Sequence, residues 1–181
     1  DLGGKVLSAT KYPYCYSFSS VIDRNVKESY VYDRLGRVSK IMSRYGNTPE
    51  TELARYEYYP TGSVKTVTLG NSLTLAYTYH ISGAIKTAEV RSADNRELYA
   101  DTLYYEDCGG NGCTPQYNGN ISRMAHHLAH GNSNYGEFRD VLYTYDELNR
   151  LIKVDDKKQD VFDEMFTYDA QGRITAQRRG D

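Results

Sequence analysis

The chain has 181 residues, a length that suits one domain with a core of its own. Its 22 basic and 24 acidic residues leave a net charge of -2, which excludes a general electrostatic attraction to nucleic acid or to a membrane surface. No apolar run approaches the roughly 18 residues that a transmembrane helix needs. The 19 Tyr residues favour strands, because the Tyr ring packs well on a pleated surface.

The chain opens at residues 1–6 with a segment that looks like the second half of a phrase found in full further on. It starts with Asp rather than Met and has no signal-peptide pattern, so we expect a piece of a longer protein. Residues 5–10 are predicted to be the return strand of a truncated hairpin. Residues 11–18 place Tyr12, Tyr14, Tyr16 and Phe18 on one face of a further strand. Pro13 cannot donate to a ladder, which favours an edge or irregular strand there.

The first full copy of the phrase covers residues 30–38, Tyr-Val-Tyr-Asp-Arg-Leu-Gly-Arg-Val. Tyr30 and Tyr32 lie two positions apart, so on a strand they point to the same face. Asp33 can accept a hydrogen bond from the backbone two residues on, and Gly36 can adopt the positive φ that closes a type I turn. A basic residue then begins the return strand. Each copy is therefore predicted to be a β-hairpin tip with an aromatic face.

The phrase returns almost whole at residues 143–151 and 166–174, and more loosely at 56–64 and 77–85. In the looser copies Pro60 and His80 are read as replacing Asp, and Ser63 and Ala84 as replacing Arg. The residues expected to build the tips are Tyr30, Tyr32, Asp33, Gly36, Arg37, Tyr58, Gly62, Tyr79, Gly83, Tyr117, Gly119, Tyr143, Tyr145, Asp146, Asn149, Arg150, Phe166, Tyr168, Asp169, Gly172 and Arg173. A nine-residue phrase that recurs in this way is typical of a repeat architecture.

The segments between the tips complete the hairpins. Strands are predicted at residues 39–45, 53–59, 63–69, 73–79, 85–92, 98–106 and 122–128, with loops at 46–50, 107–115 and 131–134, turns at 70–71 and 93–96, and a compressed tip over 117–121. A short helix over 161–166 is the nearest alternative to strand. Because a lone hairpin is marginal in water, the hairpins are expected to stack side by side and bury a shared aromatic face. The sequence therefore predicts an all-β fold of stacked antiparallel β-hairpins.

At these residues the chain resembles the Rhs proteins, also called the YD-repeat group, whose mark is a Tyr-x-Tyr-Asp-x-x-Gly-Arg-Leu phrase. Residues 117–121 also resemble a phrase that is common in bacterial members. The resemblance covers essentially the whole chain, so residues 1–181 are expected to form a single YD-repeat segment, irregular at 107–115. It implies a spiral β-sheet that winds into a hollow shell, of which this chain would be a curved or spiralling continuous sheet.

The resemblance also implies a function. In bacterial relatives such shells enclose a toxin segment of the same polypeptide, and in the teneurins a similar shell contributes to cell-surface adhesion. We therefore expect a non-catalytic shell segment that encloses or displays a toxin or effector, in a secreted or cell-surface bacterial protein whose remaining polypeptide is its partner. The alternative is a carbohydrate-binding or adhesive module, because a Tyr face is flat and has a polar rim. A segment of such a sheet has unpaired edge strands, so self-association of the chain is also expected.

Residues with catalytic or ligand-binding chemistry are few. The chain has no Gly-x-Ser-x-Gly elbow, P-loop or dinucleotide fingerprint, so neither an enzyme nor a cofactor is predicted. His126, His127 and His130 cluster, but no Cys or carboxylate stands close in sequence to complete a set, so no metal is predicted. Cys108 and Cys113 span a Gly-rich loop and could form a small disulfide in an exported parent, with free thiols or a metal pair as alternatives.

Overall fold

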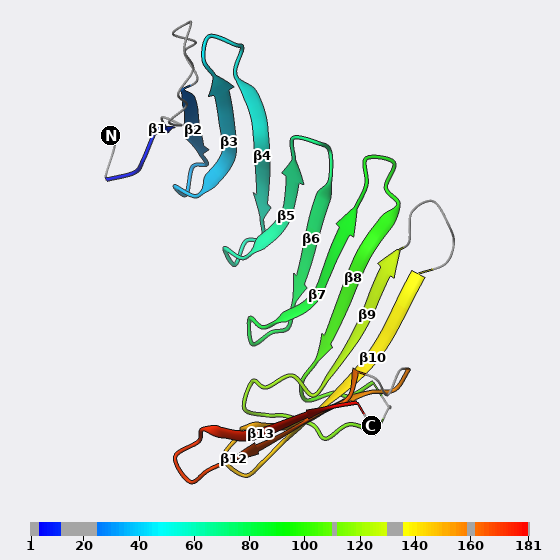
Figure 1. Cartoon of the computed structure of the whole chain (residues 1–181). Coiled ribbons are helices and arrows are strands. Elements are labelled where there is room, and N and C mark those ends of the chain that lie inside the picture. Colours follow the sequence, from blue (N-terminus) through cyan, green and yellow to red (C-terminus); the bar gives the residue numbers. More distant parts are fainter. Residues whose placement is uncertain (1–3, 12–24, 110–111, 130–135, 159–161, 181) are drawn as a thin grey trace, which may run out of the picture. The chain divides into compact units, whose positions relative to one another are not determined.

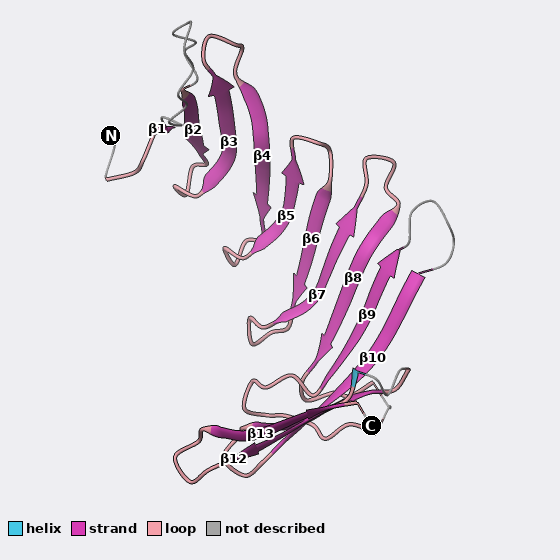
Figure 2. Ribbon diagram, in the orientation of Figure 1, coloured by secondary structure: helices cyan, strands magenta, loops and turns pink. Residues whose placement is uncertain are grey.

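The computed structural model describes residues 4–11, 25–109, 112–129, 136–158 and 162–180, which form strands and the turns between them (Figure 1 and Figure 2). The strands are β1 (Ser8–Lys11), β2 (Val26–Tyr32), β3 (Val38–Tyr45), β4 (Thr51–Tyr58), β5 (Val64–Leu69), β6 (Thr74–Tyr79), β7 (Ile85–Arg91), β8 (Glu97–Tyr104), β9 (Arg123–Ala129), β10 (Gly136–Tyr145), β11 (Leu151–Asp156), β12 (Glu164–Tyr168) and β13 (Ile174–Arg179). They form one open antiparallel sheet whose strand order follows the chain. The predicted all-β fold of antiparallel hairpins is confirmed.

The chain divides into two compact units, each with its own ladder of strands. The first comprises residues 1–76 with 92–95, and the second comprises 77–91 with 96–181. In the first unit, Tyr30 of β2 lies opposite Ile41 of β3. In the second unit, Phe166 of β12 lies opposite Gln177 of β13. Residues of the repeated phrase thus pair with the return strand of their own hairpin.

The predicted tips connect β2 to β3, β4 to β5, β6 to β7, β10 to β11 and β12 to β13, which places them at alternate turns of the chain (Figure 1). The residue that closes each tip has a positive φ: Gly36 79°, Gly62 96°, Gly83 88°, Asn149 61° and Gly172 83°. The pairing shifts by one residue at the second Tyr of the phrase, for example between Val31 and Tyr32. A type I turn followed by a left-handed residue produces this bulge in a hairpin.

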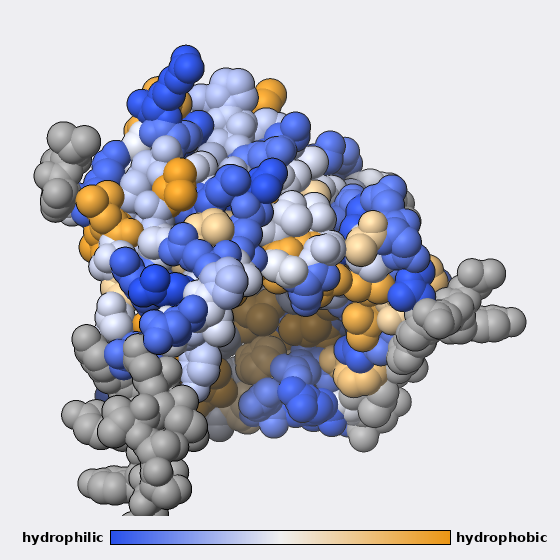
Figure 3. All heavy atoms as spheres, turned by 90° about the horizontal axis from the view of Figure 1, so that it is seen from above, coloured by the Kyte–Doolittle hydropathy of each residue, from blue (hydrophilic) through white to orange (hydrophobic). Residues whose placement is uncertain are grey.

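Full burial is rare along this sheet. Among the described residues the buried hydrophobic side chains are Ala54, Val67, Val141 and Leu142. Phrase residues such as Tyr30 and Tyr143 are only half-buried. In Figure 3, hydrophilic residues cover much of the visible surface, and hydrophobic ones form patches between them. Specific contacts between neighbouring hairpins must therefore add to the stability that apolar burial provides.

Tyr104 of β8 pairs directly with Arg123 of β9. The strands predicted at 98–106 and 122–128 thus form one hairpin, and the predicted tip at 117–121 lies in the connection between them. In the segment 161–166, for which a short helix was the alternative, residues 164–166 belong to β12. The predicted strand beyond Lys11 and the predicted loop over 131–134 lie outside the described residues.

Replacing Gly172 by Val should lower the free energy of unfolding by more than about 1 kcal/mol, because a side chain at positive φ is strained and a β-branched one most of all. A Cβ at Gly172 would meet no atom within 4 Å, so the backbone angle alone would cause the loss. Urea unfolding followed by circular dichroism measures it. The matched control is Gly172→Asn, which should cost less because Asn tolerates positive φ and occupies the equivalent position 149 with a φ of 61°. A Gly172→Val variant as stable as the parent would contradict the turn assignment.

Candidate functional site

The Asp of the phrase organises its own turn. Asp33 Oδ1 accepts hydrogen bonds from the backbone N–H groups of Leu35 and Arg37, both at 2.9 Å. Its Oδ2 accepts from Arg37 Nε at 2.7 Å. The backbone N–H and the side chain of Arg37 hold the pKa of the Asp33 carboxyl below its usual value. A single carboxylate therefore fixes both the turn and the direction of the Arg side chain that follows it.

The same arrangement recurs further along the chain. Asp146 accepts from the N–H groups of Leu148 at 3.0 Å and Arg150 at 2.9 Å, and from Arg150 Nε at 2.6 Å. Its pKa is lowered, again first by the backbone N–H of Arg150. Asp169 keeps the two backbone bonds, from Gln171 and Arg173, each at 2.9 Å. The guanidinium groups of Arg37 and Arg150 form ion pairs with their turn Asp, and that of Arg173 does not.

The oriented Arg reaches the next hairpin. The guanidinium carbon of Arg37 lies 4.3 Å from the centre of the Tyr58 ring, and that of Arg150 lies 4.6 Å from the Tyr168 ring. Arg37 also donates to Tyr59 O at 3.4 Å, and Arg150 donates to the carbonyl of Asp169 at 3.2 Å. Lys5 takes the equivalent place before the first full phrase, with Nζ 5.1 Å from the Tyr32 ring.

The second Tyr of the phrase completes the link with its hydroxyl group. In each case this hydroxyl donates to the carbonyl of the residue two positions after the left-handed turn residue of the preceding hairpin. The bonds are Tyr32 to Val6 (2.6 Å), Tyr58 to Val38 (2.7 Å), Tyr105 to Ile85 (3.1 Å), Tyr145 to Ile121 (2.8 Å) and Tyr168 to Leu151 (2.6 Å). We call this hydroxyl–carbonyl bond, with the Arg or Lys over the ring where one is present, the inter-hairpin clamp.

The looser copies retain the backbone of the turn without the Asp–Arg pair. The N–H of Tyr59 donates to Ser63 O, and the N–H of Gly62 donates to Tyr59 O, both at 2.9 Å. Tyr59, and not Pro60, therefore occupies the Asp position, and that part of the sequence prediction is wrong. His80 does occupy it, because its N–H donates to Ala84 O at 2.8 Å and its carbonyl accepts from Gly83.

The clamp also corrects the assignment of the compressed tip. Gly119 has the expected positive φ of 90°, but the Tyr117 side chain is 79% exposed. Tyr105 makes the clamp bond to Ile85 in its place. Tyr105 and Gly119 are 14 positions apart, whereas Tyr145 and Asn149 are 4 apart, so ten residues are inserted within this tip. Tyr79, the remaining predicted Tyr, ends β6 immediately before its turn.

Known proteins resemble this chain through their structures. No family model matches the chain, and no curated protein matches it. A chain in the Photorhabdus luminescens Tc holotoxin pore is similar to it, with a TM-score of 0.67 and 17% identity over 84% of the present chain. A TcdB2–TccC3–Cdc42 crystal structure gives 0.66 and 17% over 84%, and TcdB2–TccC3–TEV gives 0.65 and 18% over 83%.

This chain shares its fold with a segment of these Tc toxin chains. It spans about 8% of their length. In the described part of the chain, no helix has both the length and the apolar character that a membrane span needs.

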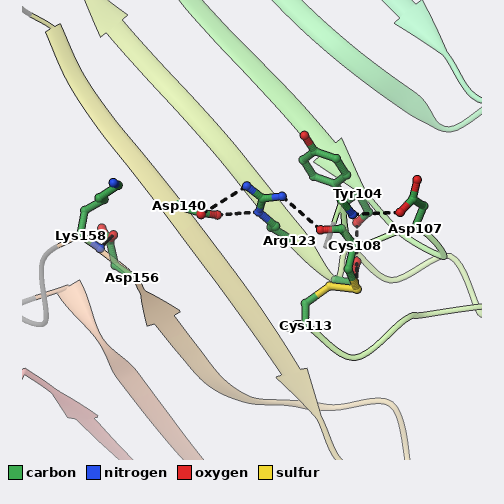
Figure 4. Close-up of polar contacts among 10 residues, drawn as sticks. Tyr104, Asp107, Cys108, Cys113, Arg123, Asp140, Asp156 and Lys158 are labelled. Atoms are coloured by element: carbon green, nitrogen blue, oxygen red, sulfur yellow. Dashed lines mark hydrogen bonds and ion pairs between the residues drawn. A yellow bond between two sulfur atoms is a disulfide. The ribbon is translucent and has the colours of Figure 1, made fainter. Parts of the chain in front are cut away.

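The inserted connection is attached to the sheet through Cys108 and Arg123 (Figure 4). Cys108 and Cys113 form a disulfide with a Cα–Cα distance of 5.7 Å, so of the alternatives left open by the sequence the structure has the disulfide. Arg123 donates to Cys108 O at 3.1 Å and forms an ion pair with Asp140 at 2.6 Å. Its guanidinium carbon also lies 4.7 Å from the Tyr104 ring. Arg123 is only 9% exposed, so this charge is nearly buried.

The histidines pair with carboxylates. His126 Nδ1 lies 2.7 Å from Asp101 Oδ1, and His127 Nδ1 lies 2.6 Å from Glu97 Oε1. The ring of His127 stacks on Phe138 at a centroid distance of 4.1 Å. His130 lies outside the described residues. Within the described part of the chain, no group of three or more His, Cys, Asp or Glu side chains could hold a metal ion.

Acid should weaken the turns that Asp33 and Asp146 stabilise. Asp33 and Asp146 have lowered pKa values in the folded state, so their contribution is present above the unfolded-state value of about 3.9 and is lost as the pH falls through the folded value. Melting temperatures measured between pH 6 and pH 2 should therefore drop below about pH 4. The Asp33→Asn/Asp146→Asn double variant should melt lower at pH 6 and lose less on acidification. An equal acid-induced loss in parent and variant would contradict this role.

Proposed function

We propose that this chain is a non-catalytic structural segment of an Rhs-like shell that encloses or displays a toxin or effector. The observation that carries the proposal is the inter-hairpin clamp, which recurs with the same chemistry at Tyr32, Tyr58, Tyr105, Tyr145 and Tyr168. Such a clamp fixes each hairpin to its predecessor, as neighbouring units do in other repeat proteins. The fold shared with Tc toxin chains supports the same role.

The proposal places the chain in a secreted or cell-surface bacterial protein, as one YD-repeat segment whose partner is the remainder of that polypeptide. The disulfide between Cys108 and Cys113 supports an oxidising location, since disulfides persist mainly outside the cytosol. The clamps would then act by keeping the wall closed around the enclosed segment.

Limited proteolysis of the natural polypeptide that contains this segment tests the proposal. We expect a protease-resistant cargo in the parent. The Arg150→Ala/Tyr168→Phe double variant removes one clamp and should expose the cargo to cleavage at lower protease concentration. The matched control is Arg178→Ala, because the exposed Arg178 lies on β13 and takes no part in a clamp. A parent cargo cleaved as fast as the free cargo would overturn the proposal.

The alternative, a carbohydrate-binding or adhesive module, is supported less well. A sugar platform needs open ring faces, and the Tyr58 and Tyr168 rings each have a cation over one face and a hydroxyl engaged by a carbonyl. A glycan array with the 181-residue chain separates the two functions. Saturable binding to a defined glycan would favour the alternative.

A further inference from the structure

The clamp at Tyr105 differs from three others in one residue. At those three, a basic residue directly after the left-handed turn residue lies over the ring of the next Tyr: Lys5, Arg37 and Arg150. At the Tyr105 clamp the same position, directly after Gly83, holds Ala84. The turn is otherwise intact, since the N–H of His80 donates to Ala84 O at 2.8 Å. This clamp therefore keeps its hydroxyl–carbonyl bond to Ile85 without a basic side chain from the preceding turn.

A cavity of about 510 Å³ lies beside Tyr105, a volume in the range of small-molecule sites. It is lined by His80, Ile81, Ser82, Tyr105, Glu106 and Asp107. Glu106 and Asp107 are exposed acidic residues, and this lining contains no Lys or Arg from the described part of the chain. The carboxylate of Asp107 is held in place, because its Oδ1 accepts from the N–H of Gly109 at 2.9 Å (Figure 4). The charge of the cavity therefore favours a cationic ligand.

The Tyr105 ring is open to this cavity although His80 contacts it. The two rings meet edge to face, with their centres 5.2 Å apart and their planes at 85°. His80 Nε2 lies 3.4 Å from Leu103 O, so the imidazole is also held at β8. An edge-to-face contact engages at most one face of the Tyr105 ring. Tyr105 is only half-buried, and part of its surface lines the cavity.

The complete clamps show which group this arrangement suits. The guanidinium carbon of Arg150 lies 4.6 Å from the centre of the Tyr168 ring, and the group is paired with the carboxylate of its turn Asp. It also donates at 3.2 Å to the carbonyl of the residue that directly follows this Tyr. Glu106 directly follows Tyr105, and its side chain adds a carboxylate at the same place. A ring, a carbonyl and carboxylates are thus assembled at Tyr105, and the turn does not supply the guanidinium.

We propose that this cavity, the Tyr105 cavity, binds a guanidinium group carried on an alkyl chain. The guanidinium lies against the Tyr105 ring, and its N–H groups donate to the carboxylates of Glu106 and Asp107. The planar guanidinium suits both contacts, because it stacks on aromatic rings and matches a carboxylate with two N–H donors. The alkyl chain lies along Ile81, whose side chain is exposed. The ligand is either a free alkylguanidine or the Arg side chain of a peptide, and both present the same chemistry.

NMR titration of the 181-residue chain with butylguanidinium tests the Tyr105 cavity. We expect saturable changes in the amide signals of residues 80–84 and 105–107. Butylurea has a similar shape without the charge, so it should bind at least about tenfold more weakly. Added salt should weaken the binding of butylguanidinium, because both carboxylates are exposed. The absence of saturable changes at these residues, or equal binding of butylurea, would overturn the proposal.

Substitutions at Ala84 test whether the ligand takes the place of the missing Arg. Ala84→Arg restores the residue of the complete clamps, so its own guanidinium should lie over Tyr105 and abolish the binding of butylguanidinium. The matched control is Ala84→Ser, which introduces the small residue found at the equivalent position 63 and should leave the affinity unchanged. An Ala84→Arg variant that binds butylguanidinium as tightly as the parent would contradict the proposed position of the ligand.

Substitutions at the carboxylates and the ring test the contacts themselves. The Glu106→Gln/Asp107→Asn double variant keeps the shape of both side chains and should lower the affinity by about tenfold. Tyr105→Phe keeps the ring and should retain binding. Unchanged affinity in the double variant would overturn the proposal. Binding of an uncharged monosaccharide in place of butylguanidinium would also overturn it and would favour the glycan alternative.

A peptide ligand separates the two sources of the guanidinium group. Similar affinities for Gly-Arg-Gly and butylguanidinium support a free alkylguanidine, whereas binding of the peptide at least about tenfold tighter supports an Arg side chain of a partner segment. The proposal goes beyond the shell role and is independent of it. Cation binding is measured on the 181-residue chain without cargo, so its failure leaves the shell role standing, and the reverse also holds.

Discussion

Asp140→Ala should destabilise the second unit by roughly 3 kcal/mol, the lower part of the range for breaking a buried ion pair. Asp140 provides the carboxylate to Arg123 Nε at 2.6 Å and to a second guanidinium nitrogen at 3.2 Å. The Arg123 and Asp140 side chains are only 11% and 18% exposed. Removing the carboxylate leaves a nearly buried cation that still donates to the Cys108 carbonyl but has lost its counter-charge. Urea unfolding followed by circular dichroism measures the loss.

The double variant Arg123→Met/Asp140→Leu is the matched control for Asp140→Ala. Replacing both charges by apolar side chains of similar size removes the pair without leaving a buried charge, so it should be much closer to the parent in stability. Asp140→Asn, which keeps an acceptor but loses the charge, should lie between the two. A double variant as unstable as Asp140→Ala would show that packing around Arg123, rather than its charge, determines the loss.

Replacing both Cys108 and Cys113 by Ser should lower the free energy of unfolding by about 2 kcal/mol. The two residues are five positions apart, and in the chain-entropy model closing so short a loop contributes about that amount. Thermal melts with and without reductant provide the measurement. Reduction should lower the melting temperature of the parent and leave that of the double variant unchanged.

The effect of the disulfide should also be separable from that of the ion pair beneath it. Arg123 contacts the carbonyl of Cys108, so the loop keeps one attachment when the disulfide is lost. The loss of unfolding free energy should therefore be larger when Cys108→Ser/Cys113→Ser and Asp140→Ala are combined than for either change alone. A double-mutant cycle measures any coupling between them. Reductant without effect on the parent would show that the thiols are not joined in solution.

The local chemistry of the tips could be predicted from the sequence. The order of Asp, two variable residues and Gly or Asn encodes a turn in four to five consecutive residues, and the structure has positive φ at Gly36, Asn149 and Gly172. The antiparallel strand order followed from the recurrence of that turn. These features depend on neighbours in sequence, which is why a single chain reveals them.

The clamp could not be predicted in the same way, because its partners lie one repeat apart. Tyr58 and Val38 are 20 residues apart, and only pairing of β3 with β4 brings them together. The Arg that recurs in the phrase did indicate a contact beyond its own hairpin, because the turn itself does not require an Arg. The insertion made this clamp harder to predict. Tyr117 has the spacing of the phrase but is exposed, whereas Tyr105 donates to the Ile85 carbonyl.

The connection over 105–122 has a practical consequence. Its ten additional residues lie between Tyr105, which still bonds to Ile85, and Ile121, which still accepts from Tyr145. Foreign peptides, such as an epitope tag or a reporter loop, could therefore be grafted at the equivalent position in other tips without disturbing the ladder on either side.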